Sequence, residues 1–232
     1  MKKPAVDYRA LRPNNITSPE YRHLLLLLGW AAYFLLYLLT ENLIPESSCH
    51  IMHSALDDKI PFLEGFAIVY VLWYAYVFGS LLRYVLYDIE SFKRLQIFIM
   101  ITQAVAMAAY IIYPTMQDLR PEISELGRSN VLTKLMAFIY SFDTPTGVCP
   151  SLHVGYSVGI ASVCLKEKGT NPVFKCVMAL FALLVCVSVV FVKQHSTIDV
   201  YWGLAVGALA EIIVYGRSFY LPKIKRLIHG KA

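Results

Sequence analysis

Residues 24–39 read LLLLLGWAAYFLLYLL, an apolar run with no charged residue. The run is too long for the apolar core of a secretory signal peptide, and no small-residue cleavage site follows it. We therefore expect it to be retained as a first membrane-spanning helix. A helix needs about 20 mostly apolar residues to cross a bilayer, and five later stretches also qualify. The expected spans are residues 24–44, 62–87, 95–114, 152–165, 173–192 and 198–216.

The composition of the whole chain agrees with a fold that is surrounded by lipid. Hydrophobic residues make up 57% of the 232 residues and charged residues 16%, whereas soluble domains carry about 25% charged residues. In lipid the backbone must satisfy its own hydrogen bonds, so we expect an all-α polytopic membrane protein. No polar linker divides the chain, which predicts one domain over residues 1–232, with an N-terminal segment (1–23) and a basic tail (217–232) outside the membrane.

The distribution of positive charge predicts the orientation in the membrane. If the N-terminus is inside, 16 of the 21 lysines and arginines fall in inner segments and five in outer ones. Inner loops of membrane proteins carry such an excess of lysine and arginine. We expect both termini in the cytoplasm and the protein in the cell membrane. We expect no nucleic-acid partner, because the basic residues flank apolar runs. The long outer connection, 115–150, includes residues 130–142, an expected amphipathic helix on the membrane surface.

Three short polar segments fall on the outer side of this topology. They are YPTMQDLRP (113–121), CPSLHV (149–154) and KQHSTID (193–199). They follow or open different spans, yet the topology was derived from lysine and arginine alone. Their placement at one face predicts that they form a single site.

The third segment contains a histidine and an aspartate four residues apart. If a helix begins near residue 195, His195 and Asp199 lie on one face and touch. A carboxylate on one imidazole nitrogen fixes the tautomer and raises the basicity of the other nitrogen, which produces a nucleophile or a base. An isolated pattern of this kind is more often an interfacial histidine beside a helix-capping aspartate.

The other two segments supply an acid and groups that bind anions. Ser151 lies near the first turn of a helix, where free N–H groups attract anions, and His153 has the chemistry of a general acid. Arg120 can hold a phosphate through paired hydrogen bonds, and Lys193 adds a point charge. Together these residues would suit a phosphate ester that is attacked by one histidine while the second protonates the leaving oxygen.

Cysteines and acidic residues give no indication of a metal or another cofactor. Cys49, His50 and His53 have a spacing that fits no standard zinc pattern, and we expect neither a metal nor a cofactor. The adjacent Asp57 and Asp58 are expected to point apart. Cys49 and Cys149 both lie outside the membrane, so the sequence leaves a disulfide between them open.

The last expected span contains two small residues and one carboxylate. Gly203 and Gly207 lie four apart, which allows a close helix crossing but is also ordinary in a membrane helix. Glu211 could be functional. Its place near the cytoplasmic end favours contact with water or with a basic partner.

The three outer segments resemble the signature motifs of the type 2 phosphatidic acid phosphatase superfamily. The family pattern is a lysine six residues ahead of Arg-Pro, then Pro-Ser-x-His, then Ser-Arg followed by a histidine and, four later, an aspartate. The matching residues are Arg120-Pro121, Pro150-Ser151-Leu152-His153, and Ser188, His195 and Asp199. The likeness covers residues 113–203, and the six-helix layout extends it over the chain.

The resemblance implies a role for each matching residue. His195 would be the nucleophile that forms a phosphohistidine, Asp199 would orient it, and His153 would protonate the leaving alcohol. Arg120 and Ser151 would hold the phosphate, without a metal.

Two family cations are replaced in this chain, by Tyr113 and by Val189. Lys193 is a candidate replacement, and Gln117 could donate a hydrogen bond to the phosphate. The stretch HSTIDV (195–200) also resembles the sphingomyelin synthase branch, which passes a head group to a lipid alcohol.

We therefore expect a metal-independent phosphatase that hydrolyses a lipid phosphomonoester or diphosphate, such as phosphatidate, at the outer membrane face. The alternative is a head-group phosphotransferase that uses the same histidine. A second alternative is a non-catalytic membrane protein. The sequence gives neither the lipid nor the oligomeric state.

Overall fold

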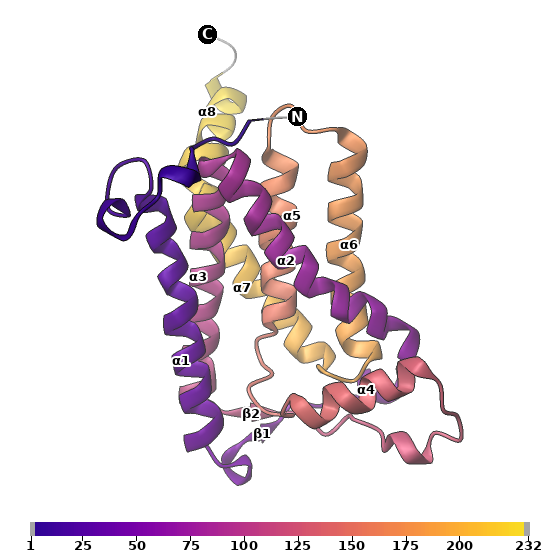
Figure 1. Ribbon diagram of the computed structural model, residues 1–232. Helices are drawn as coiled ribbons and strands as arrows, with labels where there is room; N and C mark the ends of the chain where they lie inside the picture. The colour runs from indigo at the N-terminus through magenta and orange to yellow at the C-terminus, as the bar shows by residue number, and fades with distance from the viewer. Residues whose placement is uncertain (1–2, 230–232) are drawn as a thin grey trace.

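The computed structural model describes residues 3–229 and is a bundle of long helices (Figure 1). The helices are α1 (Leu28–Leu43), α2 (Ala67–Tyr87), α3 (Ile89–Ile112), α4 (Val131–Phe142), α5 (Leu152–Lys166), α6 (Pro172–Phe191), α7 (Thr197–Tyr215) and α8 (Leu221–His229). Two short strands, β1 (His50–Ile51) and β2 (Thr115–Met116), pair in parallel with His50 opposite Thr115.

Five helical segments are long and apolar enough to cross a membrane. They are Arg22–Leu43, which contains α1 and the helical turns before it, Glu64–Tyr87 with α2, the helices α3 and α6, and Thr197–Ile228 with α7. Their outward faces carry large apolar side chains, for example Leu28, Leu183 and Trp202, each more than half exposed. In water such a surface would be costly, whereas in lipid it is the expected exterior. The structure is therefore consistent with an integral membrane protein.

The helix expected to be the fourth span, α5, is shorter than the others. Its 15 residues extend about 22 Å at 1.5 Å per residue, less than the ~30 Å hydrocarbon core. It is also the most enclosed helix, since it packs against α3, α6 and α7. Gly159 has no room for a side chain, because a Cβ would lie 2.6 Å from the Phe98 ring of α3.

The starts of α1, α2 and α3 differ from the expected spans by four residues or more, since α1 begins at Leu28 and α2 at Ala67, after the expected residues 24 and 62. α3 begins at Ile89, ahead of the expected residue 95, because the side chain of Asp88 accepts from the backbone N–H and the hydroxyl of Ser91 and caps the helix. The expected basic tail contains the helix α8. Its apolar residues recur at helical spacing, at positions 221, 224, 227 and 228.

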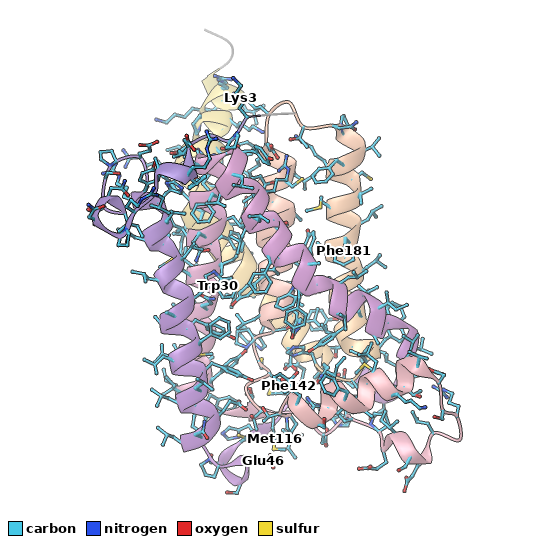
Figure 2. The ribbon with its side chains drawn as sticks, in the orientation of Figure 1. Lys3, Trp30, Glu46, Met116, Phe142 and Phe181 are labelled. Carbon is cyan, nitrogen blue, oxygen red and sulfur yellow. The ribbon has the colours of Figure 1, made fainter. Side chains whose placement is uncertain are left out.

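The connections 44–66, 113–151 and 192–196 gather at one end of the bundle, here called the loop end. Lys3 and α8 lie at the opposite end (Figures 1 and 2). The helix expected at 130–142 is α4, which runs across the loop end (Figure 1). Asn130 caps it by accepting from the N–H groups of Leu132 and Thr133. The three polar segments singled out in the sequence all lie at this end.

Candidate active site

The start of α7 places a histidine and an aspartate in contact. Ser196 caps the helix by accepting from the N–H of Ile198 (3.1 Å), and Asp199 accepts in return from the N–H of Ser196 (2.9 Å). This reciprocal pair is a capping box. The same carboxylate oxygen of Asp199 lies 3.2 Å from Nδ1 of His195. The expected contact is present, and it follows from the hydrogen bonds that cap the start of α7.

A second histidine continues the chain of contacts. His153, in the first turn of α5, has its Nδ1 3.4 Å from Nε2 of His195. Its ring is held by Tyr70 and Trp73, at centroid distances of 4.8 and 4.1 Å. Because Asp199 accepts the Nδ1 proton of His195, the hydrogen-bond network assigns the lone pair to Nε2. His153 then donates its Nδ1–H to that lone pair.

Both histidines line a cavity of about 710 Å³ between α1, α2, α5 and the end of α4. Trp30 and Phe142, labelled in Figure 2, both line it, so it extends from the middle of the bundle to the loop end. Phe34 and Tyr74, on α1 and α2, also line it and are about half exposed on the outside of the bundle. The cavity therefore opens sideways between two membrane-facing helices. Much of its wall is aromatic, formed by Trp30, Tyr33, Tyr37, Tyr70, Trp73 and Tyr74.

The charged side chains on the cavity wall, among the residues that the structure describes, are Glu41 and Asp143. Glu41 accepts from the hydroxyl of Thr146 at 2.9 Å. Asp143 accepts from the hydroxyl of Tyr70 (3.3 Å) and from the amide of Gln194 (3.2 Å). Burial raises the pKa of the Asp143 carboxyl. Within residues 3–229, no lysine or arginine lines this cavity.

Arg120 lies close to the cavity wall, but its terminal nitrogens are occupied. Nη1 donates to the carbonyl of Asp143 (2.6 Å), and Nη2 donates to the carbonyl of Thr144 (2.9 Å) and to the side-chain oxygen of Gln194. Its guanidinium also lies 4.9 Å from the Tyr140 ring centroid. Burial lowers the pKa of Arg120. The guanidinium thus fixes the connection after α4, and its Nε is buried with no partner in the described structure.

The other proposed phosphate ligands are divided between two places. Ser151 is buried next to the histidines, its N–H donates to the carbonyl of Asp199 (3.1 Å), and its hydroxyl has no partner among the described residues. Lys193 and Gln117 are buried but do not line the cavity. The ammonium of Lys193 donates to the carbonyl of Asp57 (2.8 Å), and burial lowers its pKa.

The two positions that depart from the resembling motifs are also accounted for. Tyr113 is 52% exposed and stacks on His50, with 3.9 Å between ring centroids. Val189 is buried, and its carbonyl accepts from the N–H of His195 at 3.1 Å. Neither residue contributes a charge to the cavity.

Four polar residues near the site were not assigned a part in it from the sequence: Glu41, Asp57, Asp143 and Gln194. Asp57 and Asp58 do point apart, as expected, since Asp57 bonds to Ser196 whereas Asp58 bonds to His53. In the sequence, these residues lie in or beside the connections between the expected spans, and this position was the signal that could have pointed to them. Cys49 and Cys149, for which a disulfide was left open, are both free.

Comparison with models of protein families, with curated proteins and with solved structures returned no match for this chain. The resemblance drawn from the three motifs is therefore not supported by a wider similarity.

Proposed function

We propose that this protein is a metal-independent lipid phosphate phosphatase that works through a phosphohistidine on His195. The observation that carries the proposal is the continuous contact from Asp199 to His195 to His153 on the wall of a cavity that opens sideways. A lipid can present its phosphate to such a cavity without leaving the bilayer. The nucleophile, its orienting carboxylate and a proton donor then lie within one small region.

In the first step, the lone pair on Nε2 of His195 attacks phosphorus and the bond between phosphorus and the ester oxygen breaks. That oxygen takes the Nδ1 proton of His153, which enters the step as an imidazolium and becomes a neutral imidazole, and leaves as the lipid alcohol. In the second step, water gives a proton to His153, attacks the phosphohistidine and releases phosphate. Since phosphorus cannot fit between nitrogens 3.4 Å apart, substrate binding must turn the His153 ring aside.

In this proposal, neighbouring hydrogen-bond donors stabilise the negative charge on the phosphate oxygens. The Ser151 hydroxyl is buried and unpartnered among the described residues, and it lies at the N-terminus of α5. Free N–H groups and the helix dipole favour an anion there. Arg120 contributes its positive charge from outside the cavity lining. Lys193 stabilises the connection that carries His195.

The membrane arrangement in this proposal has six spans, with α5 as the fourth, and α4 lies at the membrane surface. The lysine and arginine asymmetry puts both termini in the cytoplasm and the site at the outer face. α5 crosses as a short helix because its neighbours, rather than lipid, surround it.

A second candidate, a head-group phosphotransferase, is favoured by the charge on the cavity wall. An anionic lipid phosphate would face Glu41 and Asp143 with no lysine or arginine among the lining residues described. A head group with an ammonium would instead be attracted to both carboxylates and to the aromatic faces. The phosphohistidine would then carry the head group to a lipid alcohol instead of to water.

The test is product analysis with purified protein in detergent and EDTA. Phosphatidate, phosphatidylglycerol phosphate and a polyprenyl diphosphate are assayed for phosphate release, next to His195→Ala. A parallel reaction holds a zwitterionic phospholipid and diacylglycerol or ceramide as acceptor. Phosphate release that depends on His195 supports the phosphatase. A His195-dependent new phospholipid supports the transferase, and neither product from any substrate contradicts both.

A further inference from the structure

The first connection at the loop end reaches across the fold to the segment that carries His195. Asp57, in this connection, is 1% exposed. Its carboxylate accepts from the hydroxyl of Ser196 (2.6 Å) and from the backbone N–H of Thr197 (2.8 Å). Its backbone carbonyl accepts from the ammonium of Lys193 (2.8 Å). One residue therefore bonds to three positions around His195, about 140 residues further along the chain.

The carboxylate of Asp57 is held in its charged form. Burial alone would raise its pKa, but hydrogen bonds from Ser196, Thr197 and Ser54 outweigh burial and lower the pKa of Asp57 below its ordinary value. Thr197 is the first residue of α7, where a negative charge is favoured by the helix dipole. A buried carboxylate is costly unless it is fully hydrogen-bonded, so this contact specifies one arrangement of the two segments.

The backbone between α6 and α7 needs such support. Lys193 has φ +53°, a left-handed conformation that is strained for a residue with a side chain. The next two N–H groups, of Gln194 and His195, both turn back to the carbonyl of Val189. This turn sets the direction of the His195 ring, and the bond from Lys193 to Asp57 holds it.

The same connection is also tied to the 113–121 segment. β1 pairs with β2, and the ring of His53 bonds to Asp118 (2.8 Å) and to Asp58 (2.7 Å). The first connection thus joins two of the three polar segments that form the site.

We propose that Asp57 is the positioning residue of the site, which holds Ser196 and Thr197 so that His195 and Asp199 keep their contact. The inference rests on the proposed function, but Asp57 touches neither the cavity nor a reacting atom. Its effect is transmitted through Ser196, whose N–H donates to the Asp199 carboxylate.

The test compares Asp57→Asn with Asp58→Asn, a matched control because the Asp58 carboxylate is exposed and, among residues 3–229, its side-chain hydrogen bond is to His53. In the substrate assay that detects turnover, Asp57→Asn should lower kcat by about 10- to 100-fold through misplacement of His195, with KM within about twofold and a shifted pH profile. Asp58→Asn should keep the kcat and pH profile of the parent. Ser196→Ala combined with Asp57→Asn should lose little more than the worse single variant.

A second readout does not depend on turnover. The imidazole ¹⁵N shifts of His195, assigned with His195→Gln in ¹⁵N-histidine-labelled protein, should change in Asp57→Asn and not in Asp58→Asn. Unchanged shifts, or a loss of activity that only follows the amount of folded protein with the parent pH profile, would overturn the inference. If the parent shows no turnover, the proposed function fails, while these shifts still decide whether Asp57 positions His195.

Discussion

One added methyl group where α7 contacts the start of α5 tests whether this contact sets the geometry of the site. Gly203 of α7 faces Ser151 and Val154, and a Cβ at this glycine would lie 2.8 Å from the Ser151 carbonyl oxygen and 2.9 Å from the Val154 Cβ. Ordinary contact begins at 3.4 Å. The first obstacle is backbone, so Gly203→Ala must separate the two helices by about 0.6 Å.

The cost can be worked out from that displacement. Overpacking of this size costs about 1–3 kcal/mol, which lowers Tm by about 2–12 °C for a protein of this length. α5 carries His153 and α7 follows His195, so their nitrogens move apart. A misplacement of 1 Å can cost about 100-fold in rate, so we expect a loss of about 10-fold or more in kcat at saturating substrate.

The assay pairs thermal unfolding in detergent with initial rates on the substrate that the parent turns over. Gly79→Ala is the matched control, because a Cβ at Gly79 meets nothing within 4 Å and alanine stabilises a helix relative to glycine by up to about 1 kcal/mol. Gly203→Ala with the parent Tm and kcat would refute the reasoning that this crossing sets the geometry of the site.

Three further predictions concern the histidines. Asp199→Asn should lower kcat by about 10³- to 10⁴-fold with nearly unchanged KM, because the wrong tautomer of His195 is then favoured; steady-state kinetics measures both constants. His153→Gln should lower the rate by about 10²- to 10⁴-fold on lipid esters, but much less on an aryl phosphate whose leaving group needs no proton. Bonds to Asp118 and Asp58 raise the pKa of His53 above 6.5, so its stabilisation is complete below about pH 6.5 and is lost as pH rises through the raised pKa. The Tm difference between the parent and His53→Gln should therefore shrink between pH 6 and pH 9, and a constant difference would contradict this.

The apolar pattern was enough to predict the long helices, since lipid imposes a length and a composition on each span. It was less informative at helix ends, because hydropathy does not detect the polar first turn of α3, which Asp88 caps. The close approach at Gly203 and Gly207 is confirmed, as Cβ atoms there would crowd Val154 and Val158. The expected basic partner of Glu211 is Lys166, at 2.6 Å.

The contact between His195 and Asp199 could be predicted because both residues belong to one helix start, where spacing fixes distance. Their meeting with His153 followed from placing the three segments at one face. The sequence could not show which groups the long side chains of Arg120 and Lys193 would bond to. Arg120 bonds to backbone carbonyls after α4 and Lys193 bonds to Asp57, and such pairings depend on how the connections fold over one another. The acidic wall formed by Glu41 and Asp143 was missed for the same reason.

The central claim is that His195 accepts the phosphoryl group. The most direct test is to mix the purified protein with a substrate that it turns over, quench in alkaline denaturant, where phosphohistidine is stable, and locate the added mass by peptide mapping. We expect a phosphoryl adduct, or a phosphoryl group with its head group attached, on the peptide that contains His195. It should be absent in His195→Ala and enriched in His153→Gln when the substrate is an aryl phosphate, whose leaving group needs no proton. Turnover with no adduct on His195 in the parent or in His153→Gln, or turnover that survives His195→Ala, would contradict the claim.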